Sequence, residues 1–280
     1  MRILDVTEIR EAVAELSVRA NYFLSGDVKD AIAAGSGTET WPVAQDILER
    51  IKENISIAEE GALPLCQDTG LACVFLEIGQ EVHLAGGSVE KAVNDGIKKG
   101  YAEGYLRQSV VADPLRRTNT GDNTPASIHY KIVDGDKVKI IVAPKGFGSE
   151  NMSRINMLPP SAGAEGVKDF VVAVCGEAGA NPCPPIVVGV GIGGTFDQVA
   201  LLAKEALLAP LDRPNEDPFY AGMEEELLSR INSLGIGPQG FGGRTTALAV
   251  KIKTAPTHIA GLPVAVNLNC HVSRHAETIL

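Results

Sequence analysis

The order of helical and strand patterns along the chain is the feature that most constrains its fold. Two apolar segments, "ACVFLEIG" (72–79) and "PIVVGVGIGGT" (185–195), are typical of buried strands. Apolar residues at helical spacing predict helices at 7–25, 27–34, 39–60, 88–106, 163–179, 196–210 and 218–234. Helices and strands are mixed without strict alternation. The sequence therefore predicts an α/β (mixed α+β) fold with mixed sheets flanked by helices, in one large domain over residues 1–280.

Further strands are expected in the middle and near the end of the chain. The segment "ASIHYKIVDGDKVKIIVAP" (126–144) alternates on both sides of "DGD", which predicts a β-hairpin. Two more strand patterns follow at 245–253 and 263–269. Neither an internal repeat nor a low-complexity segment interrupts this order.

The charge of the chain excludes several partners. A formal net charge of −10 argues against binding to nucleic acid or to an anionic membrane. No stretch of about 18 uncharged apolar residues is present, so no membrane-spanning segment is expected. An anionic substrate would need arginines placed locally. The five cysteines and the lack of a signal-peptide pattern indicate a reducing compartment, and we expect the cytoplasm.

The five cysteines fall into two groups by their surroundings. Cys66, Cys183 and Cys270 lie in or beside polar turns, whereas Cys73 and Cys175 lie inside apolar strand and helix patterns. A lone cysteine is usually a small core residue, and the separations of 117 and 87 residues match no local metal motif. Ligands of an iron–sulfur cluster can be distant in sequence, however. Three thiolates would leave one iron of a cubane open to act as a Lewis acid.

Other polar segments also lie where strands are expected to end. "YLRQS" (105–109) contains Arg107, and "PKGFGSENMSR" (144–154) contains glycines that expose backbone N–H groups to an anion. Each segment taken alone is an ordinary turn or a solvated charge. Their gathering at strand ends is typical of ligand sites in α/β folds.

Two short motifs have weaker interpretations. "GVGIGG" (189–194) matches the dinucleotide-binding glycine pattern, but no second strand ending in an acidic residue follows at the required distance. A tight strand-to-helix turn is the better explanation. "CHVSRH" (270–275) suggests zinc only weakly, because no fourth ligand lies nearby in the sequence.

Four motifs together resemble one family. "CQDTG", "GFGSENMSR", "NPCPP" followed by "IGGT", and "NCHVSRH" resemble, in this order, the iron–sulfur-dependent class I fumarases and tartrate dehydratases. The resemblance covers residues 5–280 and is to their α subunit, the N-terminal part of single-chain members. It implies that a [4Fe–4S] cluster is ligated by Cys66, Cys183 and Cys270. It also implies substrate contacts from Gln67, Asp68, Arg107 and a backbone group near Gly148, with Asp68 and His258 as catalytic residues.

The resemblance implies a hydro-lyase that reversibly hydrates fumarate to malate, a step of the tricarboxylic acid cycle. A close alternative is dehydration of L-tartrate. Two alternatives of other classes are an NAD-dependent dehydrogenase using "GVGIGG" and a non-catalytic cluster-binding protein. The polar residues Gln67, Asp68 and Arg107 argue against the last, because a protein that only senses a cluster needs only the cysteines.

The resemblance also implies a partner. Single-chain members continue into a second domain that supplies further arginine and lysine residues and a threonine base, whereas this sequence ends ten residues past Cys270. We therefore expect a separate β subunit, without which the chain is inactive. Association of two α chains, which would give a heterotetramer, is expected from the same resemblance.

Overall fold

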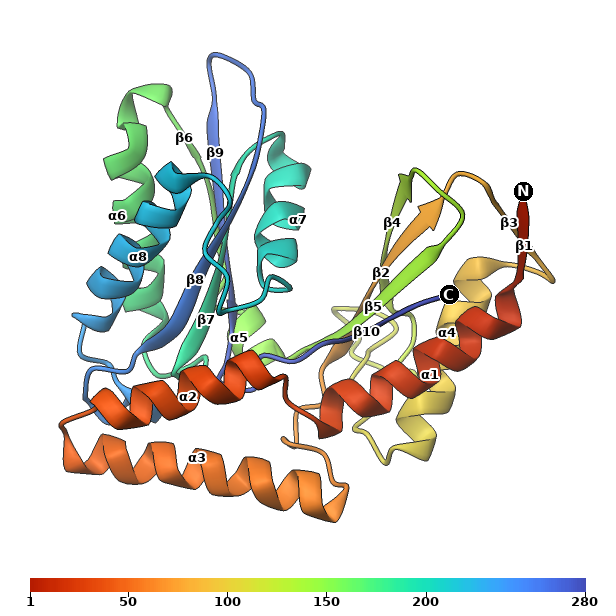
Figure 1. The fold of residues 1–280 in the computed structure, drawn as a ribbon, viewed down its shortest axis with the longest axis horizontal. Helices are drawn as coiled ribbons and strands as arrows, with labels where there is room; N and C mark the ends of the chain where they lie inside the picture. The colour runs from red at the N-terminus through yellow and green to blue at the C-terminus, as the bar shows by residue number, and fades with distance from the viewer. The chain divides into compact units, whose positions relative to one another are not determined.

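The computed structural model describes residues 1–280 and divides into two compact units, each with a mixed sheet and helices of its own (Figure 1). Unit 1 consists of Met1–Leu24, Ile55–Phe147 and Arg274–Leu280, and unit 2 of Ser25–Asn54 and Gly148–Ser273. The predicted α/β class with mixed sheets is confirmed. None of the helices has the length and apolarity needed to cross a membrane.

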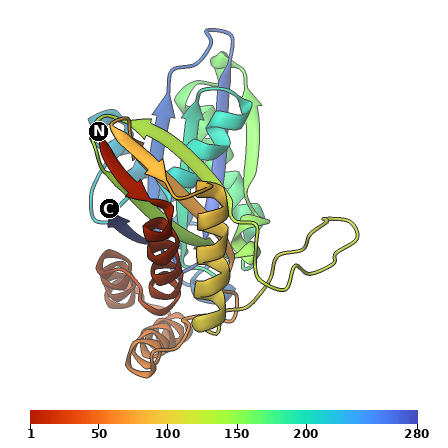
Figure 2. The ribbon, with the colours of Figure 1, turned by 90° about the vertical axis from the view of Figure 1, so that its right-hand side faces the viewer.

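Unit 1 is a four-stranded sheet with two helices side by side on one face (Figures 1 and 2). The strands follow the order β10 (Ala276–Ile279), β5 (Val138–Lys145), β2 (Leu71–Gly79) and β4 (Ser127–Val133). The helices are α1 (Val6–Tyr22) and α4 (Val89–Glu103), and β1 (Arg2–Asp5) pairs in parallel with β3 (Val82–Ala85). Figure 2 shows the yellow-green segment between α4 and β4 extending away from the sheet.

The predicted hairpin at 126–144 is wrong in its pairing, although both strands form. β2 lies between β4 and β5, parallel to the first and antiparallel to the second. The turn between them crosses the end of β2, where Gly79 N–H donates to the Lys137 carbonyl oxygen at 2.8 Å. β2 is almost wholly buried, so it needs a hydrogen-bonding partner along each edge. That requirement decides the pairing, and sequence alternation alone does not reveal it.

Unit 2 is a three-layer arrangement around a second four-stranded sheet. The strands follow the order β6 (Arg154–Leu158), β9 (Leu262–Asn269), β7 (Ile186–Gly193) and β8 (Ala247–Ala255). Figure 1 shows α6 (Gly163–Ala178) and α8 (Pro218–Asn232) on one face and α7 (Phe196–Ala206) on the other. The remaining helices are α2 (Gly26–Thr38), α3 (Pro42–Gly61), whose last residues belong to unit 1, and the short α5 (Phe147–Glu150).

The glycines of "GVGIGG" have a packing explanation. A Cβ atom on Gly189 would lie 2.3 Å from the Ala203 carbonyl oxygen, and one on Gly191 would lie 2.3 Å from the Val199 carbonyl oxygen. Both acceptors belong to α7, so the two glycines let this helix approach β7 closely. Gly193 and Gly194 then form the turn with φ of +89° and +72°. The first two glycines thus lie inside a strand against a helix, not in a loop that would face a phosphate.

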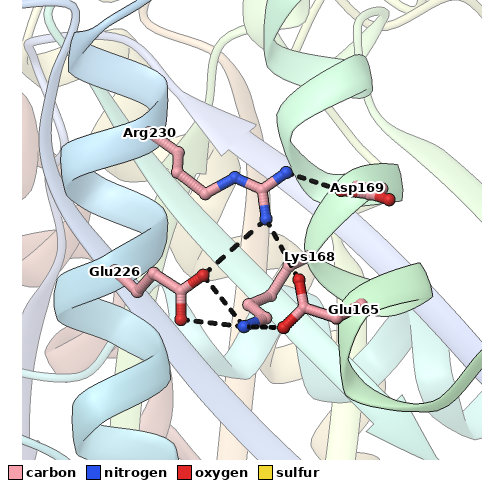
Figure 3. A network of polar contacts seen from close by, with 5 residues as sticks. All are labelled: Glu165, Lys168, Asp169, Glu226 and Arg230. Atoms are coloured by element: carbon pink, nitrogen blue, oxygen red, sulfur yellow. Dashed lines mark hydrogen bonds and ion pairs between the residues drawn. The ribbon is translucent and has the colours of Figure 1, made fainter.

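An ion-pair network joins the polar faces of α6 and α8 (Figure 3). Lys168 Nζ lies 2.8 Å from Glu226 Oε2 and also pairs with Glu165, and Arg230 Nη2 lies 2.5 Å from Asp169 Oδ1. Hydrogen bonds to Glu165 and Glu226 raise the pKa of Lys168. The acids are exposed, so the network contributes modestly and fixes the alignment of the two helices more than it stabilises them.

A buried carboxylate ties the end of α2 to the segment before β8. Glu39, only 3% exposed, accepts N–H groups from Thr40 and Trp41 through Oε1. Its Oε2 accepts from Arg244 N at 2.7 Å and Thr245 N at 3.0 Å. Burial alone would raise the pKa of Glu39, but these backbone hydrogen bonds lower it overall.

We expect the Glu39→Gln substitution to destabilise unit 2 by roughly 2–3 kcal/mol, because an amide nitrogen would face buried N–H donors. The lowered pKa means that the carboxylate stabilises the fold above about pH 4.5, its ordinary value, and that this contribution disappears as the pH falls through the folded-state pKa. Thermal unfolding between pH 3 and 7 measures both effects. Glu49→Gln, at an exposed ion pair with Lys52, is the control, and equal losses in both variants would contradict the assignment.

Candidate functional site

Buried hydrogen bonds within unit 1 fix the backbone of the "CQDTG" turn at both of its ends. It lies between α3 and β2, and Leu65 N–H anchors its start on the Asn21 carbonyl oxygen at 2.9 Å. At its end, the Tyr101 hydroxyl donates to the Thr69 carbonyl oxygen at 2.8 Å. Cys66 is half-buried and Gln67 exposed, so the turn presents these side chains outward from a fixed backbone.

Backbone contacts with Thr69 place Arg107 next to this turn. Its N–H donates to Thr69 Oγ1 at 2.8 Å, and that hydroxyl lies 3.3 Å from the Arg107 carbonyl oxygen. The fully buried Asn123 reinforces the arrangement, because it accepts from Ser109 N at 2.7 Å and donates to the Gly70 carbonyl oxygen at 3.2 Å. The Arg107 side chain remains exposed and available to an anion. Asn123 was not predicted; its only sequence signal is its place in a long polar loop.

Asp68 joins the turn to the segment after β5. Its Oδ1 accepts from Gly70 N and its Oδ2 from Phe147 N, both at 3.0 Å. Arg274 Nη2 donates to its backbone carbonyl oxygen. The carboxylate is thus held by backbone donors, and Gln67 and Asp68 share the turn that the Arg107 backbone contacts in unit 1.

In unit 2, Cys183 and Cys270 lie at the same end of the sheet. β7 and β9 run antiparallel with Val187 opposite Asn269, so the residues before β7 and after β9 are neighbours. His271 Nδ1 lies 3.0 Å from the Cys183 carbonyl oxygen, which links the two cysteine loops directly. Cys183 itself is exposed, with φ of +56°.

Gly148 lies beside the Cys183 loop within unit 2. A Cβ atom on this glycine would be 3.5 Å from the Asn181 carbonyl oxygen. Two residues further along α5, Glu150 contacts Lys204 Nζ at 2.6 Å and Asn267 Nδ2 at 2.6 Å. These contacts fix α5 against α7 and β9, and neither Glu150 nor Asn267 was predicted as part of the site.

The other two cysteines are core residues, as predicted. Cys73 in β2 and Cys175 in α6 are buried, and burial raises the pKa of the Cys175 thiol to about 12. A thiol with such a pKa is a poor ligand, because metals bind the thiolate. Cys183 is exposed and Cys66 and Cys270 are half-buried, so these three thiols are more accessible.

His258 is separated from the cysteines of its own unit. It lies in the turn between β8 and β9, whereas Cys270 follows the other end of β9. The eight residues of β9 span about 23 Å at about 3.3 Å per residue. Within one chain, the structure therefore does not bring His258 near Cys183 or Cys270.

The donor set fits an iron–sulfur cluster better than a hard cation. Neither unit by itself gathers three His, Cys, Asp or Glu side chains around a possible metal position. Cys66 belongs to unit 1, and Cys183 and Cys270 belong to unit 2. The accessible side chains of the cysteine loops are soft thiols, which iron–sulfur clusters use. A buried guanidinium with unpaired donors, that of Arg274, also binds the residue two positions after Cys66.

Known proteins resemble the chain over nearly its whole length. A family model described as fumarate hydratase (Fumerase) matches residues 10–279. A protein of Methanocaldococcus jannaschii, named as a candidate L(+)-tartrate dehydratase subunit alpha, is 44% identical over 96% of both chains. The L(+)-tartrate dehydratase subunit alpha of Escherichia coli O157:H7 is 30% identical over 98% of this chain and 91% of its own. The similarity therefore includes both units.

Proposed function

Since the chain belongs to the fumarate hydratase (Fumerase) family, we propose that it is the α subunit of an iron–sulfur hydro-lyase that reversibly hydrates fumarate to malate. The observation that carries this proposal is the assembly of Gln67, Asp68 and Arg107 around the turn that begins at Cys66. We further propose that residues 1–280 act as one catalytic domain in the cytoplasm.

Cys66, Cys183 and Cys270 would hold a [4Fe–4S] cluster. When bound, this cluster supplies a Lewis acid that polarises the hydroxyl group leaving the substrate. Arg107 binds one substrate carboxylate, which the negative net charge of the chain would otherwise repel. Gln67 and the N–H group of Gly148 donate hydrogen bonds to substrate oxygens. The Asp68 carboxylate accepts hydrogen bonds from Gly70 N and Phe147 N and still has free lone pairs. These lone pairs accept a hydrogen bond from the substrate hydroxyl group.

Anaerobic reconstitution with iron and sulfide tests the proposed cofactor. The purified chain should turn brown and contain about four iron and four sulfide per chain. Exposure to air should release iron from an open site. A colourless chain that takes up no iron, while remaining folded by circular dichroism, would contradict the proposal.

Dehydration of L-tartrate is the second candidate, and the names of the relatives favour it. Malate and tartrate differ by one hydroxyl group. Dehydration of either one removes water across adjacent carbons of a four-carbon dicarboxylate. The loaded complex should be assayed for loss of fumarate absorbance and for oxaloacetate formed from tartrate. The substrate with the higher kcat/KM identifies the activity.

We expect Arg107→Lys to lower kcat/KM by about tenfold or more, because lysine lacks the planar fork that binds a carboxylate through two N–H groups. Iron content should not change, since the backbone contacts of residue 107 with Thr69 are retained. Arg116→Lys, on the same extended loop, is the control. Unchanged kcat/KM in the Arg107 variant would remove this side chain from the site.

A separate β subunit and a second α chain complete the proposal. The base and further cations that remove the C3 proton are assigned to the β subunit, since unit 1 and unit 2 each lack a convincing base. His258 can act only in the site of a second α chain, because β9 separates it from Cys183 and Cys270 of its own chain. Two α and two β chains would then form the proposed heterotetramer.

Mixing two inactive variants tests the role of His258. We expect His258→Asn and Cys183→Ala chains to be inactive alone. When they are unfolded together, refolded, loaded and assayed with the β subunit, mixed dimers should recover about a quarter of wild-type activity, because half of the dimers are mixed and each has one intact site. No recovery, with mixed dimers verified by native mass spectrometry, would exclude His258 from a shared site.

A further inference from the structure

Arg274 is a buried cation with hydrogen-bonding capacity that the chain does not fill. It lies in unit 1 at the start of the segment that leads into β10, and 5% of its surface is exposed. Nη2 donates to the Asp68 carbonyl oxygen. Nε and Nη1 are buried and have no partner. A guanidinium remains charged at any physiological pH, so these donors are costly to leave unmatched.

The surroundings of Arg274 do not provide the missing acceptor. The Asp68 carboxylate accepts from Gly70 N and Phe147 N. The nearby Tyr101 hydroxyl is directed to the carbonyl oxygens of Thr69 and Gly70. Buried polar groups in folded proteins nearly always have partners, so an acceptor is expected in the working state.

We propose that Arg274 is an anion-holding positioning residue, whose Nε and Nη1 donate to an anionic group that enters with the loaded site. This inference rests on the proposed function. Arg274 follows Cys270 by four residues and binds the backbone two residues after Cys66, so it is attached to two of the three proposed cluster-binding segments. The anion is a cluster sulfide or thiolate, or a carboxylate of the substrate.

The test compares Arg274→Met and Arg274→Lys with wild-type protein in the apo and loaded forms. Methionine removes every donor, and lysine keeps the charge while losing the planar guanidinium. Arg50→Met is the control, since the Arg50 side chain is 70% exposed. The measurements are the unfolding temperature with and without the cluster, the rate of iron loss, the cluster reduction potential, and KM in the presence of the β subunit.

We expect the rise in unfolding temperature on loading to be smaller in both Arg274 variants than in wild type, with a similar unfolding temperature for all apo proteins. If the acceptor belongs to the cluster, iron should be lost about tenfold faster and the reduction potential should fall. If it belongs to the substrate, KM should rise about tenfold while both cluster properties stay constant.

A merely structural arginine gives a different result. It would lower the unfolding temperature of the apo and loaded forms equally and leave iron loss, potential and KM unchanged, which would overturn the inference. If Arg274→Met does not fold, Arg274→Lys carries the same comparison. Failure of wild-type protein to take up iron would instead contradict the proposed function, so the two failures are distinguishable.

Discussion

A Cys183→Ala chain is expected to fold normally and to take up almost no iron under conditions in which wild-type protein takes up about four. Cys183 is exposed, so its thiol contributes little to packing, and the expected stability change is within about 0.5 kcal/mol. Its loss leaves two proposed ligands, too few to retain a cubane against chelators. Iron analysis after desalting with a chelator measures the effect.

Cys175→Ala is the matched control for this experiment. Cys175 is buried in α6, and burial holds its thiol in the protonated form at neutral pH. We expect a stability loss of about 1 kcal/mol from the small cavity and a full complement of iron. A Cys175 variant without iron, beside a Cys183 variant that keeps it, would reverse the assignment of ligands.

Gly191→Ala should destabilise the chain by about 3 kcal/mol or more, because the added methyl group has no room beside α7. The new Cβ would lie 2.3 Å from the Val199 carbonyl oxygen and 2.8 Å from the Ala203 nitrogen. Both contacts are with helix backbone, so no side chain can rotate away and α7 must move as a whole. The unfolding temperature should fall by roughly 6 °C or more.

Gly222→Ala is the control for Gly191→Ala, because it makes the same substitution at a position where the new methyl group meets no other atom. Gly222 is inside α8, and a Cβ atom there would meet nothing within 4 Å. Alanine should stabilise that helix by up to about 1 kcal/mol. A Gly191 variant as stable as wild type would show that α7 does not need the close approach to β7.

Much of the fold was predictable because helices and buried strands leave local patterns. The helices α4 and α8, which Ser88 and Asp217 cap, and the buried strand β7 all formed where the sequence indicated. Short edge strands such as β6 and β10 were not predicted. Their existence depends on pairing with strands far away in the sequence, and four or five residues carry too little pattern by themselves.

Site residues that belong to short sequence motifs could be predicted, whereas residues that depend on contacts between distant parts of the chain could not. Gln67, Asp68 and Arg107 were identified from short motifs, and the structure brings them together in unit 1. Asn123 and Arg274 were missed because their roles depend on contacts 53 and 206 residues away. His258 was named from the resemblance alone, and the length of β9 separates it from Cys270 within one chain.

The most direct test of the central claim is an activity measurement on the cluster-loaded chain with and without its β subunit. The chain should first be shown to contain about four iron, and then assayed for fumarate hydration and tartrate dehydration. We predict no turnover of either substrate by the loaded α chain alone and full turnover of one substrate once the β subunit is added. Full activity of the isolated, loaded chain, or no activity with either substrate in the complete complex, would contradict the account.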